Sequence, residues 1–106
     1  NEIFITGKGE HTCYDSLSGR YFKSDIEKIR QLINTLNYRM RSEMYIGLND
    51  FYDEIGLAPT KLGEDLGWNM DNGEIKITFS TQLADDGAPC LVLNYEVVPK
   101  FGYEEL

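Results

Sequence analysis

The chain lacks long apolar runs. Its longest aliphatic stretch is Leu91-Val92-Leu93, whereas a membrane-spanning helix needs roughly 20 apolar residues. No apolar signal-type segment opens the chain, so we expect it to be soluble as given and to reach a membrane only through a missing segment. The chain begins with Asn1 instead of methionine, and we therefore expect a natural protein that is longer at its N-terminus.

Cysteine and histidine are scarce. The chain has two cysteines, Cys13 and Cys90, and one histidine, His11. A disulfide framework needs more cysteines at closer spacing, and a structural zinc site needs four ligands. Three interpretations remain open: independent thiols in a reducing compartment, one disulfide, or a metal site that joins His11 to both thiols. We favour independent thiols and expect no cofactor and no metal.

Basic residues are too few to favour nucleic-acid binding. The chain has 10 Lys+Arg against 18 Asp+Glu, a formal net charge of −8. Residues 1–42 carry seven basic and five acidic residues, and residues 43–106 carry three and thirteen, which leaves +2 and −10. Affinity for nucleic acid comes largely from Lys and Arg that displace condensed counterions. We therefore expect no direct nucleic-acid binding and an unidentified protein partner instead, although such charge layouts most often serve solubility.

Length and composition indicate one domain over residues 1–106, the C-terminal part of a longer protein. A hydrophobic content of 42% with 26% charged residues is ordinary for a globular chain and excludes wholesale disorder. A chain of 106 residues has room for a single core. The oligomeric state is open, and a homo-oligomer is compatible with the sequence.

Two helices are predicted from capping and periodicity. Ser24 and Glu27 have the spacing of a capping box, and apolar residues then recur at three- and four-residue intervals, which predicts a long helix over Ser24–Met40. The stripe could form a coiled-coil seam, but packing on a sheet is the commoner use. Asn49 as N-cap and Gly56 as C-terminal stop predict a short helix over Asn49–Ile55. The apolar stripe of the long helix is Ile26, Ile29, Ile33, Leu36 and Met40.

Alternating apolar and polar residues predict the strands. Residues 74–80 and 90–98 form a C-terminal hairpin, an earlier hairpin surrounds the turn-rich residues 15–19, and residues 3–6 form a short strand. We therefore expect an α+β fold. In it, a small antiparallel sheet, made of the C-terminal hairpin plus the N-terminal strands, packs against one long helix, and the second, short helix closes an edge.

No catalytic signature is present. The glycine-rich residues 56–68 lack the GxxxxGK[ST] and GxGxxG spacings that cradle phosphates. Residues 71–73 and 85–87 resemble pieces of calcium loops, but no twelve-residue loop with a terminal glutamate follows, so turns explain them. Carboxylate pairs such as Glu64 with Asp65 are expected by chance among 18 acidic residues. Acid–base catalysis needs one desolvated carboxyl group, which adjacency does not provide.

Aromatic residues offer a candidate recognition surface, since Trp, Tyr and Arg dominate binding hot spots. Core packing is nevertheless the commoner use for Trp68 and Phe51. We place the candidate surface near residues 20–21 and 63–68. Its members are Arg20, Tyr21, Tyr52, Gly63, Asp65, Gly67 and Trp68.

Several sequence blocks, spread from about Cys13 to the acidic end, share their order and spacing with a known family. These blocks are Tyr14-Asp15, Ser18–Phe22, Ser24, Leu48–Tyr52, Ile55–Leu57, Pro59, Leu66–Trp68, and Asp85–Gly87 with Cys90. The chain resembles a domain-of-unknown-function family of short proteins encoded by phages and prophages of Gram-positive bacteria. Members tend to carry an N-terminal hydrophobic segment, so the resemblance implies the soluble C-terminal domain of a membrane-associated phage protein. It supplies no activity and no catalytic residues.

Three functions remain open. The first is a non-enzymatic protein-interaction module of phage or prophage origin, because binding without chemistry needs only a rigid scaffold and exposed anchors. The second is an acidic decoy that imitates the charge of DNA and inhibits a host nucleic-acid enzyme. Its active surface would be residues 43–106, which carry a net charge of −10. The third is a small cell-wall hydrolase that uses a carboxylate pair.

Overall fold

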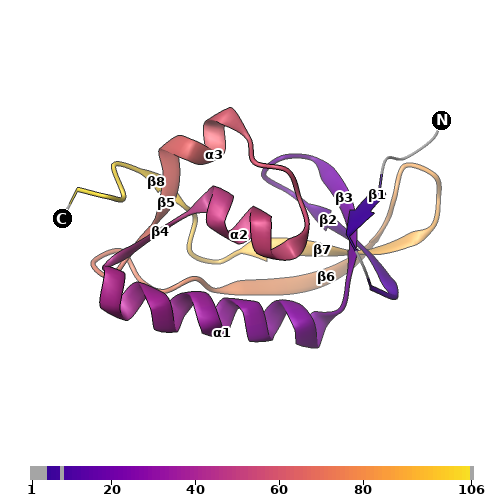
Figure 1. Ribbon diagram of the computed structural model, residues 1–106. Helices are drawn as coiled ribbons and strands as arrows, with labels where there is room; N and C mark the ends of the chain where they lie inside the picture. The colour runs from indigo at the N-terminus through magenta and orange to yellow at the C-terminus, as the bar shows by residue number, and fades with distance from the viewer. Residues whose placement is uncertain (1–4, 8, 106) are drawn as a thin grey trace.

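The computed structural model describes residues 5–7 and 9–105, which form three helices and eight strands arranged in two sheets (Figure 1). The strands are β1 (Ile5–Gly7), β2 (His11–Asp15), β3 (Arg20–Ser24), β4 (Tyr45–Gly47), β5 (Leu66–Asn69), β6 (Ile77–Leu83), β7 (Pro89–Tyr95) and β8 (Lys100–Phe101). The helices are α1 (Ile26–Glu43), α2 (Leu48–Ile55) and α3 (Lys61–Asp65).

The first sheet is mixed and has the strand order β1-β3-β2-β7-β6. Two antiparallel hairpins form it, β2 with β3 and β6 with β7. Parallel pairing of β2 with β7 joins the hairpins and brings Cys13 beside Leu91, while β1 pairs in parallel with β3. The first sheet therefore joins strands from residues 5–24 with strands from residues 77–95.

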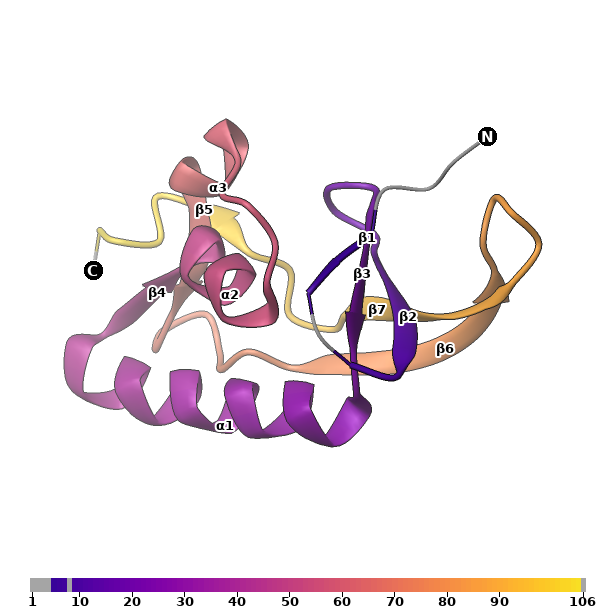
Figure 2. The ribbon, with the colours of Figure 1, turned by 45° about the vertical axis from the view of Figure 1, so that its right-hand side comes forward.

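The second sheet consists of three short antiparallel strands in the order β4-β5-β8, at the opposite end of the molecule (Figure 2). The ring of Tyr103 packs on two of its glycines. A Cβ atom at Gly67 would lie 2.6 Å from Cδ2 of Tyr103 and 2.4 Å from the carbonyl oxygen of Ile46. At Gly47, it would lie 2.9 Å from the Tyr103 hydroxyl oxygen. Only glycine leaves room for the ring at these positions.

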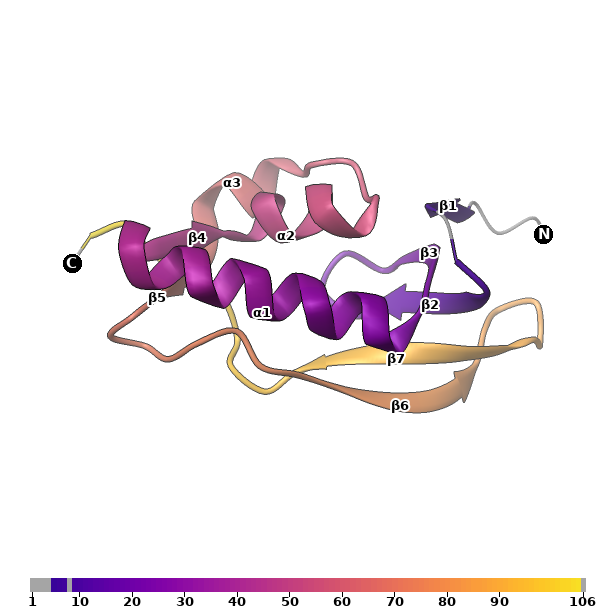
Figure 3. The ribbon, with the colours of Figure 1, turned by 60° about the horizontal axis from the view of Figure 1, so that its bottom comes forward.

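Helix α1 runs along both sheets (Figures 2 and 3). It begins after Asp25, whose backbone is extended, and ends at Glu43. The C-cap Met44 donates its N–H to the carbonyl of Met40 at 2.7 Å, and its left-handed backbone (φ 77°) turns the chain out of the helix. The buried face of α1 comprises Ile29, Ile33, Leu36, Asn37 and Met40. Of the helices in the described part of the chain, none combines the length and the apolar content needed to span a bilayer.

One core joins α1, α2 and both sheets. Phe51 of α2, Trp68 of β5 and Tyr95 of β7 meet in it: the Trp68 and Tyr95 rings stack at 6.3 Å between centroids, and Phe51 meets Trp68 edge-on at 6.1 Å. The indole N–H of Trp68 donates to the Val97 carbonyl at 2.7 Å, which satisfies the only polar group of that buried ring.

The two faces of the first sheet differ in burial. Cys13 faces the main core. Cys90 lies on the other face, in a smaller cluster with Val92 and Ala84. Tyr14 and Tyr21 pack against this smaller cluster. Both cysteines are buried and free. Because their side chains lie on opposite faces of the sheet, they cannot form a disulfide without rearrangement of the strands.

The predicted architecture is wrong. The chain is α+β, but it has two sheets and three helices instead of one small antiparallel sheet with one long and one short helix. The first sheet is mixed, and the core face of α1 is shared among α2 and strands of both sheets instead of covering the hairpin alone. The second sheet escaped prediction because its strands have only two to four residues, too few for a period-2 pattern.

Local predictions were better than the architecture. Both hairpins are confirmed, with strand ends shifted by a few residues. The capping box is wrong, because Ser24 is still a strand residue opposite His11 and the helix begins at Ile26. Gly56 is confirmed as the C-cap of α2, but its N-cap is Gly47, whose N–H donates to the Asp50 carboxylate at 3.0 Å. Of the strand predicted over residues 3–6, residues 3 and 4 lie outside the described residues.

Candidate functional site

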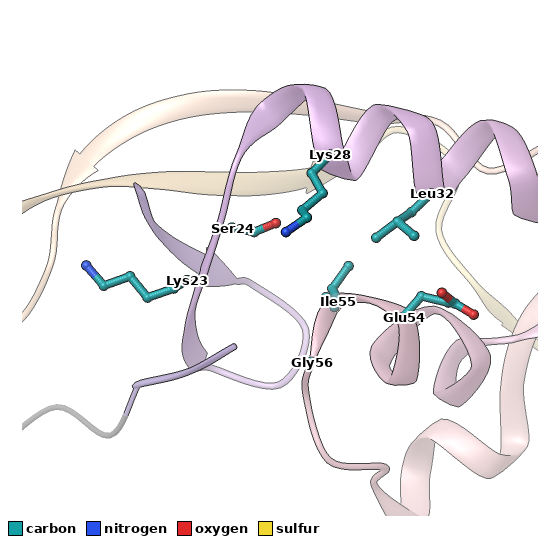
Figure 4. Close-up of a pocket in the computed structure, with 7 residues that line it drawn as sticks. All are labelled: Lys23, Ser24, Lys28, Leu32, Glu54, Ile55 and Gly56. Atoms are coloured by element: carbon teal, nitrogen blue, oxygen red, sulfur yellow. The ribbon is translucent and has the colours of Figure 1, made fainter. Parts of the chain in front are cut away.

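A cleft of about 350 Å³ lies between the first turns of α1 and the last turn of α2. Figure 4 shows its walls: Lys28 and Leu32 point into it from α1, Ile55 points into it from α2, and Glu54 lies at the α2 rim. Its volume is at the lower end of the range of roughly 300–1,000 Å³ that is typical of ligand pockets. The lining residues are Lys23, Ser24, Lys28, Leu32, Glu54, Ile55 and Gly56.

The corner between β3 and α1 fixes the position of α1, which forms one wall of the cleft. Asp25 occupies this corner, and its carboxylate accepts from the Glu10 amide at 3.1 Å and from Nδ1 of His11 at 3.0 Å. The hydrogen bond from His11, and then the one from Glu10, hold the pKa of Asp25 below its ordinary value. These contacts tie the start of α1 to β2, so the first turns of the helix have a defined position.

The C-terminal cap of α2 fixes the other wall of the cleft, which α2 forms. Gly56 has a left-handed backbone (φ 87°), and the N–H of Leu57 donates to the Tyr52 carbonyl at 2.9 Å, which ends the helix. Ile55 is thereby turned inward and is 4% exposed, while Glu54 stays exposed at the rim.

The lining combines an apolar floor with opposite charges. Leu32 and Ile55 belong to or pack against the main core and form the floor. Lys28 supplies a cation on the α1 side and Glu54 an anion on the α2 side. The charge of Lys23 lies outside the cleft, because its side chain points away from the cleft in Figure 4 and its Nζ donates to Thr12 Oγ1 at 2.9 Å. Such a lining suits an apolar side chain flanked by charged ones.

A buried polar network holds the β2–β3 hairpin against the core next to this region. Asp15 is 0% exposed, and its carboxylate accepts from the hydroxyl of Tyr95, from the Ser18 hydroxyl at 2.6 Å and from the Ser18 amide at 3.0 Å. Burial, and then the charge of Asp15, raise the pKa of Tyr52 and Tyr95, so both hydroxyls remain protonated. Both oxygens of the Asp15 carboxylate therefore accept hydrogen bonds and are shielded from solvent, which indicates a structural role.

Arg20 extends the network to the loop after α2. Its Nε donates to Ser18 Oγ at 2.9 Å and its Nη1 to the carbonyl of Ala58 at 2.7 Å. Its Cζ lies 4.9 Å from the centroid of the Tyr52 ring, within the range of a cation–π contact. The guanidinium thus links the hairpin to α2 and to the segment that follows it.

The seven residues predicted as a binding surface do not lie on one surface. Trp68 and Tyr52 are each 1% exposed and belong to the core. Arg20 and Tyr21 are neighbours in β3 and point to opposite faces; the Tyr21 hydroxyl accepts from the Asp85 amide at 3.2 Å. Asp65 is exposed at the end of α3.

The two predicted site glycines have packing roles. Gly67 makes room for Tyr103, as described above. At Gly63, a Cβ atom would lie 2.1 Å from Oδ1 of Asn49. That side chain binds both backbone groups of Thr60, donating to its carbonyl and accepting from its amide at 2.9 Å each. Gly63 therefore leaves room for the hydrogen bonds by which Asn49 connects α2 to the start of α3.

The sequence analysis missed four side chains that line the cleft, Lys28, Leu32, Glu54 and Ile55. Leu32 carried a usable signal, because it is apolar yet lies outside the predicted stripe of α1. Lys28, four residues earlier, is its neighbour on the same helix face. The α2 side could not be found from the sequence, because it depends on how the two helices pack.

Other candidate chemistry is not assembled among the described residues. No three His, Cys, Asp or Glu side chains of residues 5–7 and 9–105 gather as a metal site would require. Burial raises the pKa of the Cys13 thiol to about 11, and it also raises the pKa of Cys90. The adjacent carboxylates Glu64 and Asp65 are both exposed, so burial desolvates neither of them.

No match was found among curated proteins or among solved structures. One protein-family match covers almost the whole chain: a family described as being of unknown function (DUF6353) matches residues 1–104. That extent includes both sheets, the cleft and the buried network. The chain therefore belongs to the family of unknown function DUF6353.

Proposed function

We propose that this domain is a non-enzymatic protein-interaction module that holds a short segment of a partner protein in the cleft between α1 and α2. The observation that carries the proposal is the lining of the cleft, an apolar floor with Lys28 on one rim and Glu54 on the other. Charges of opposite sign on the two rims favour one direction of a bound segment.

The chemistry of the lining defines the segment. Its central residue is apolar and rests on Leu32 and Ile55, an acidic residue lies toward Lys28, and a basic residue lies toward Glu54. Partial burial of an aliphatic side chain contributes roughly 1–2 kcal/mol, and the flanking charges add orientation more than affinity. These contributions are small and the segment must be ordered, so we expect binding no tighter than the micromolar range, about −8 kcal/mol.

The state of the potentially reactive side chains supports a function without catalysis. Both oxygens of the buried Asp15 carboxylate accept hydrogen bonds, and burial disfavours the reactive thiolate form of Cys13. His11 is committed to Asp25. From the resemblance in sequence, we further propose that the partner belongs to the biology of a phage or prophage in a Gram-positive host.

Selection from a random peptide library tests the proposal. We expect selected peptides to share the acidic–apolar–basic pattern and to shift the amide resonances of Lys28, Leu32 and Ile55. Lys28→Glu should weaken their binding about three- to fivefold, which corresponds to about 0.7–1 kcal/mol. The matched control is Lys61→Glu, the same charge reversal at an exposed position of α3, which should leave binding unchanged.

Failure of the selection to yield such peptides, or equal effects of the two lysine reversals, would refute the cleft as the binding site. The acidic decoy predicts a different result. Its binding to a nucleic-acid enzyme would fall steeply with added salt and would not respond to Leu32→Asp.

A further inference from the structure

Strand β6 forms an open edge of the first sheet. It is the last strand in the order β1-β3-β2-β7-β6, and no other strand of the described residues pairs with its outer side. Figure 3 shows this margin free of other elements, with α1 lying over the face of the sheet and not along β6. An unpaired edge exposes a row of backbone donors and acceptors that can bind another strand.

Hydrogen bonds at the two ends of the hairpin fix the direction of these backbone groups. The Glu96 amide donates to the Lys76 carbonyl at 2.9 Å, and the Ala84 amide donates to the Ala88 carbonyl at 2.7 Å. Backbone groups alternate in direction along an antiparallel strand. The even-numbered residues of β6 therefore bond to β7, and the odd-numbered ones direct their N–H and C=O groups outward. These outward residues are Ile77, Phe79, Thr81 and Leu83.

The edge lacks the features that normally prevent pairing. Such features are a very short strand, a proline, a bulge or a charged side chain within the strand. β6 has seven residues, Ile77–Leu83, paired with β7 in unbroken register, and none of them is proline or charged. Leu83 is 74% exposed although it is a large aliphatic residue in a strand.

The charged residues that flank β6 are complementary in sign to those that flank β6 of a second copy. Lys76 precedes the strand, and Asp85 and Asp86 follow it in the exposed turn. If two β6 strands pair antiparallel about a two-fold axis at Ser80, each Lys76 lies beside the acidic turn of the other copy. The same register pairs Ile77 with Leu83, and it uses every outward backbone group.

We propose that this edge pairs with β6 of a second copy of the chain, so that two first sheets form one continuous sheet centred on Ser80. Ile77 of one copy then lies opposite Leu83 of the other, and Phe79 lies opposite Thr81. The occupant is a second copy because the contact is self-complementary: a basic start meets an acidic end twice, as two-fold symmetry requires. The proposal does not depend on the cleft.

Sedimentation of the whole chain over about a thousandfold range of concentration tests the proposal. We expect a monomer–dimer equilibrium that Thr81→Pro abolishes. The Thr81 N–H points outward, so proline removes an intermolecular donor and leaves the bonds to β7 intact. A circular dichroism spectrum equal to that of the parent chain confirms that this variant folds. A parent chain that stays monomeric throughout, or a Thr81→Pro chain that still dimerises, would overturn the proposal.

Cysteine crosslinking tests the register. In the proposed dimer, Ser80 lies opposite itself in a non-hydrogen-bonded pair, with Cα atoms about 4.5 Å apart, which permits a disulfide. The matched control is Gln82, which lies opposite Thr78 and so about 13 Å from its own copy. Mild oxidation should link Ser80→Cys chains and not Gln82→Cys chains. Equal crosslinking of both variants would contradict this register.

The flanking charges give an independent check. Lys76→Glu should weaken dimerisation at least about fivefold, because it places like charges at both ends of the interface. Reversal of Asp85 and Asp86 to lysine in the same chain should restore it. Restoration shows that the charges meet across the interface, and its absence would overturn the two-fold arrangement.

Discussion

Replacement of Asp15 by alanine should severely destabilise the fold. The carboxylate is 0% exposed and accepts three hydrogen bonds, from the Tyr95 hydroxyl and from the hydroxyl and amide of Ser18. Each hydrogen bond to a charged group contributes about 1.5–3 kcal/mol, and buried donors left without an acceptor cost a similar amount. The loss is partly offset because the buried charge no longer needs to be desolvated. We expect a net destabilisation of about 3–4 kcal/mol.

Denaturant unfolding followed by circular dichroism measures this change as a lower midpoint at an unchanged slope. In a thermal scan, it corresponds to a fall in Tm of roughly 10–20 °C. Asp85→Ala is the matched control, since that side chain is exposed in the turn before β7, and it should change stability by no more than about 0.5 kcal/mol. A loss below about 1 kcal/mol for Asp15→Ala would refute the view that the network anchors the hairpin.

A double-mutant cycle isolates the contact between Asp15 and Tyr95. Tyr95→Phe alone removes one donor and leaves the carboxylate with its two bonds from Ser18, so we expect a smaller loss of about 1–2 kcal/mol. In combination with Asp15→Ala, the two effects should fall short of additivity by about 1–2 kcal/mol, because both variants remove the same bond. Strict additivity would show that the two side chains do not interact.

Three further predictions concern packing, reactivity and pH. Gly63→Ala should destabilise the fold by about 2–3 kcal/mol in thermal unfolding, because the new Cβ would lie 2.1 Å from Asn49 Oδ1. An unchanged Tm would contradict the view that Gly63 makes room for the hydrogen bonds between Asn49 and Thr60. Iodoacetamide at pH 8 should leave Cys13 unmodified in the native protein and label it in denaturant, since its pKa is raised to about 11; rapid native labelling would disprove its burial. The pKa of Asp25 is lower in the folded state than its ordinary 3.8, so its stabilising contribution is present above about pH 4 and is lost as pH falls through the folded pKa. Asp25→Asn should therefore flatten the acid limb of the stability curve, and an identical acid limb would contradict the contact.

The sequence predicted features that depend on neighbours along the chain. The apolar stripe of α1 and the two hairpins arise from short-range periodicity and turn residues, and all three are present. The capping box at Ser24 failed because the same residue pairs with His11 in the sheet, and that pairing takes precedence over the local helix signal. The limit of local reasoning therefore lies where a residue has two competing partners.

Features that depend on distant segments could not be predicted. Asp15 and Tyr95 are 80 positions apart and meet only because β2 pairs in parallel with β7. The cleft similarly needs the packing of α1 on α2, which no motif encodes. The prediction of Trp68 as a surface residue is wrong, because its indole is buried and donates to the Val97 carbonyl. Core packing is the commoner use of a tryptophan.

The polar network and the proposed binding cleft are connected through the loop after α2. Arg20 binds the carbonyl of Ala58 at 2.7 Å and stacks on the Tyr52 ring, so the end of α2 is held against the β2–β3 hairpin. At the other wall, Asp25 holds the start of α1 to β2 through His11. Both walls of the cleft are therefore anchored to the same hairpin before any segment binds. A wall that is already ordered costs little entropy on binding, and this preorganisation supports the proposal that the cleft of about 350 Å³ binds a short segment.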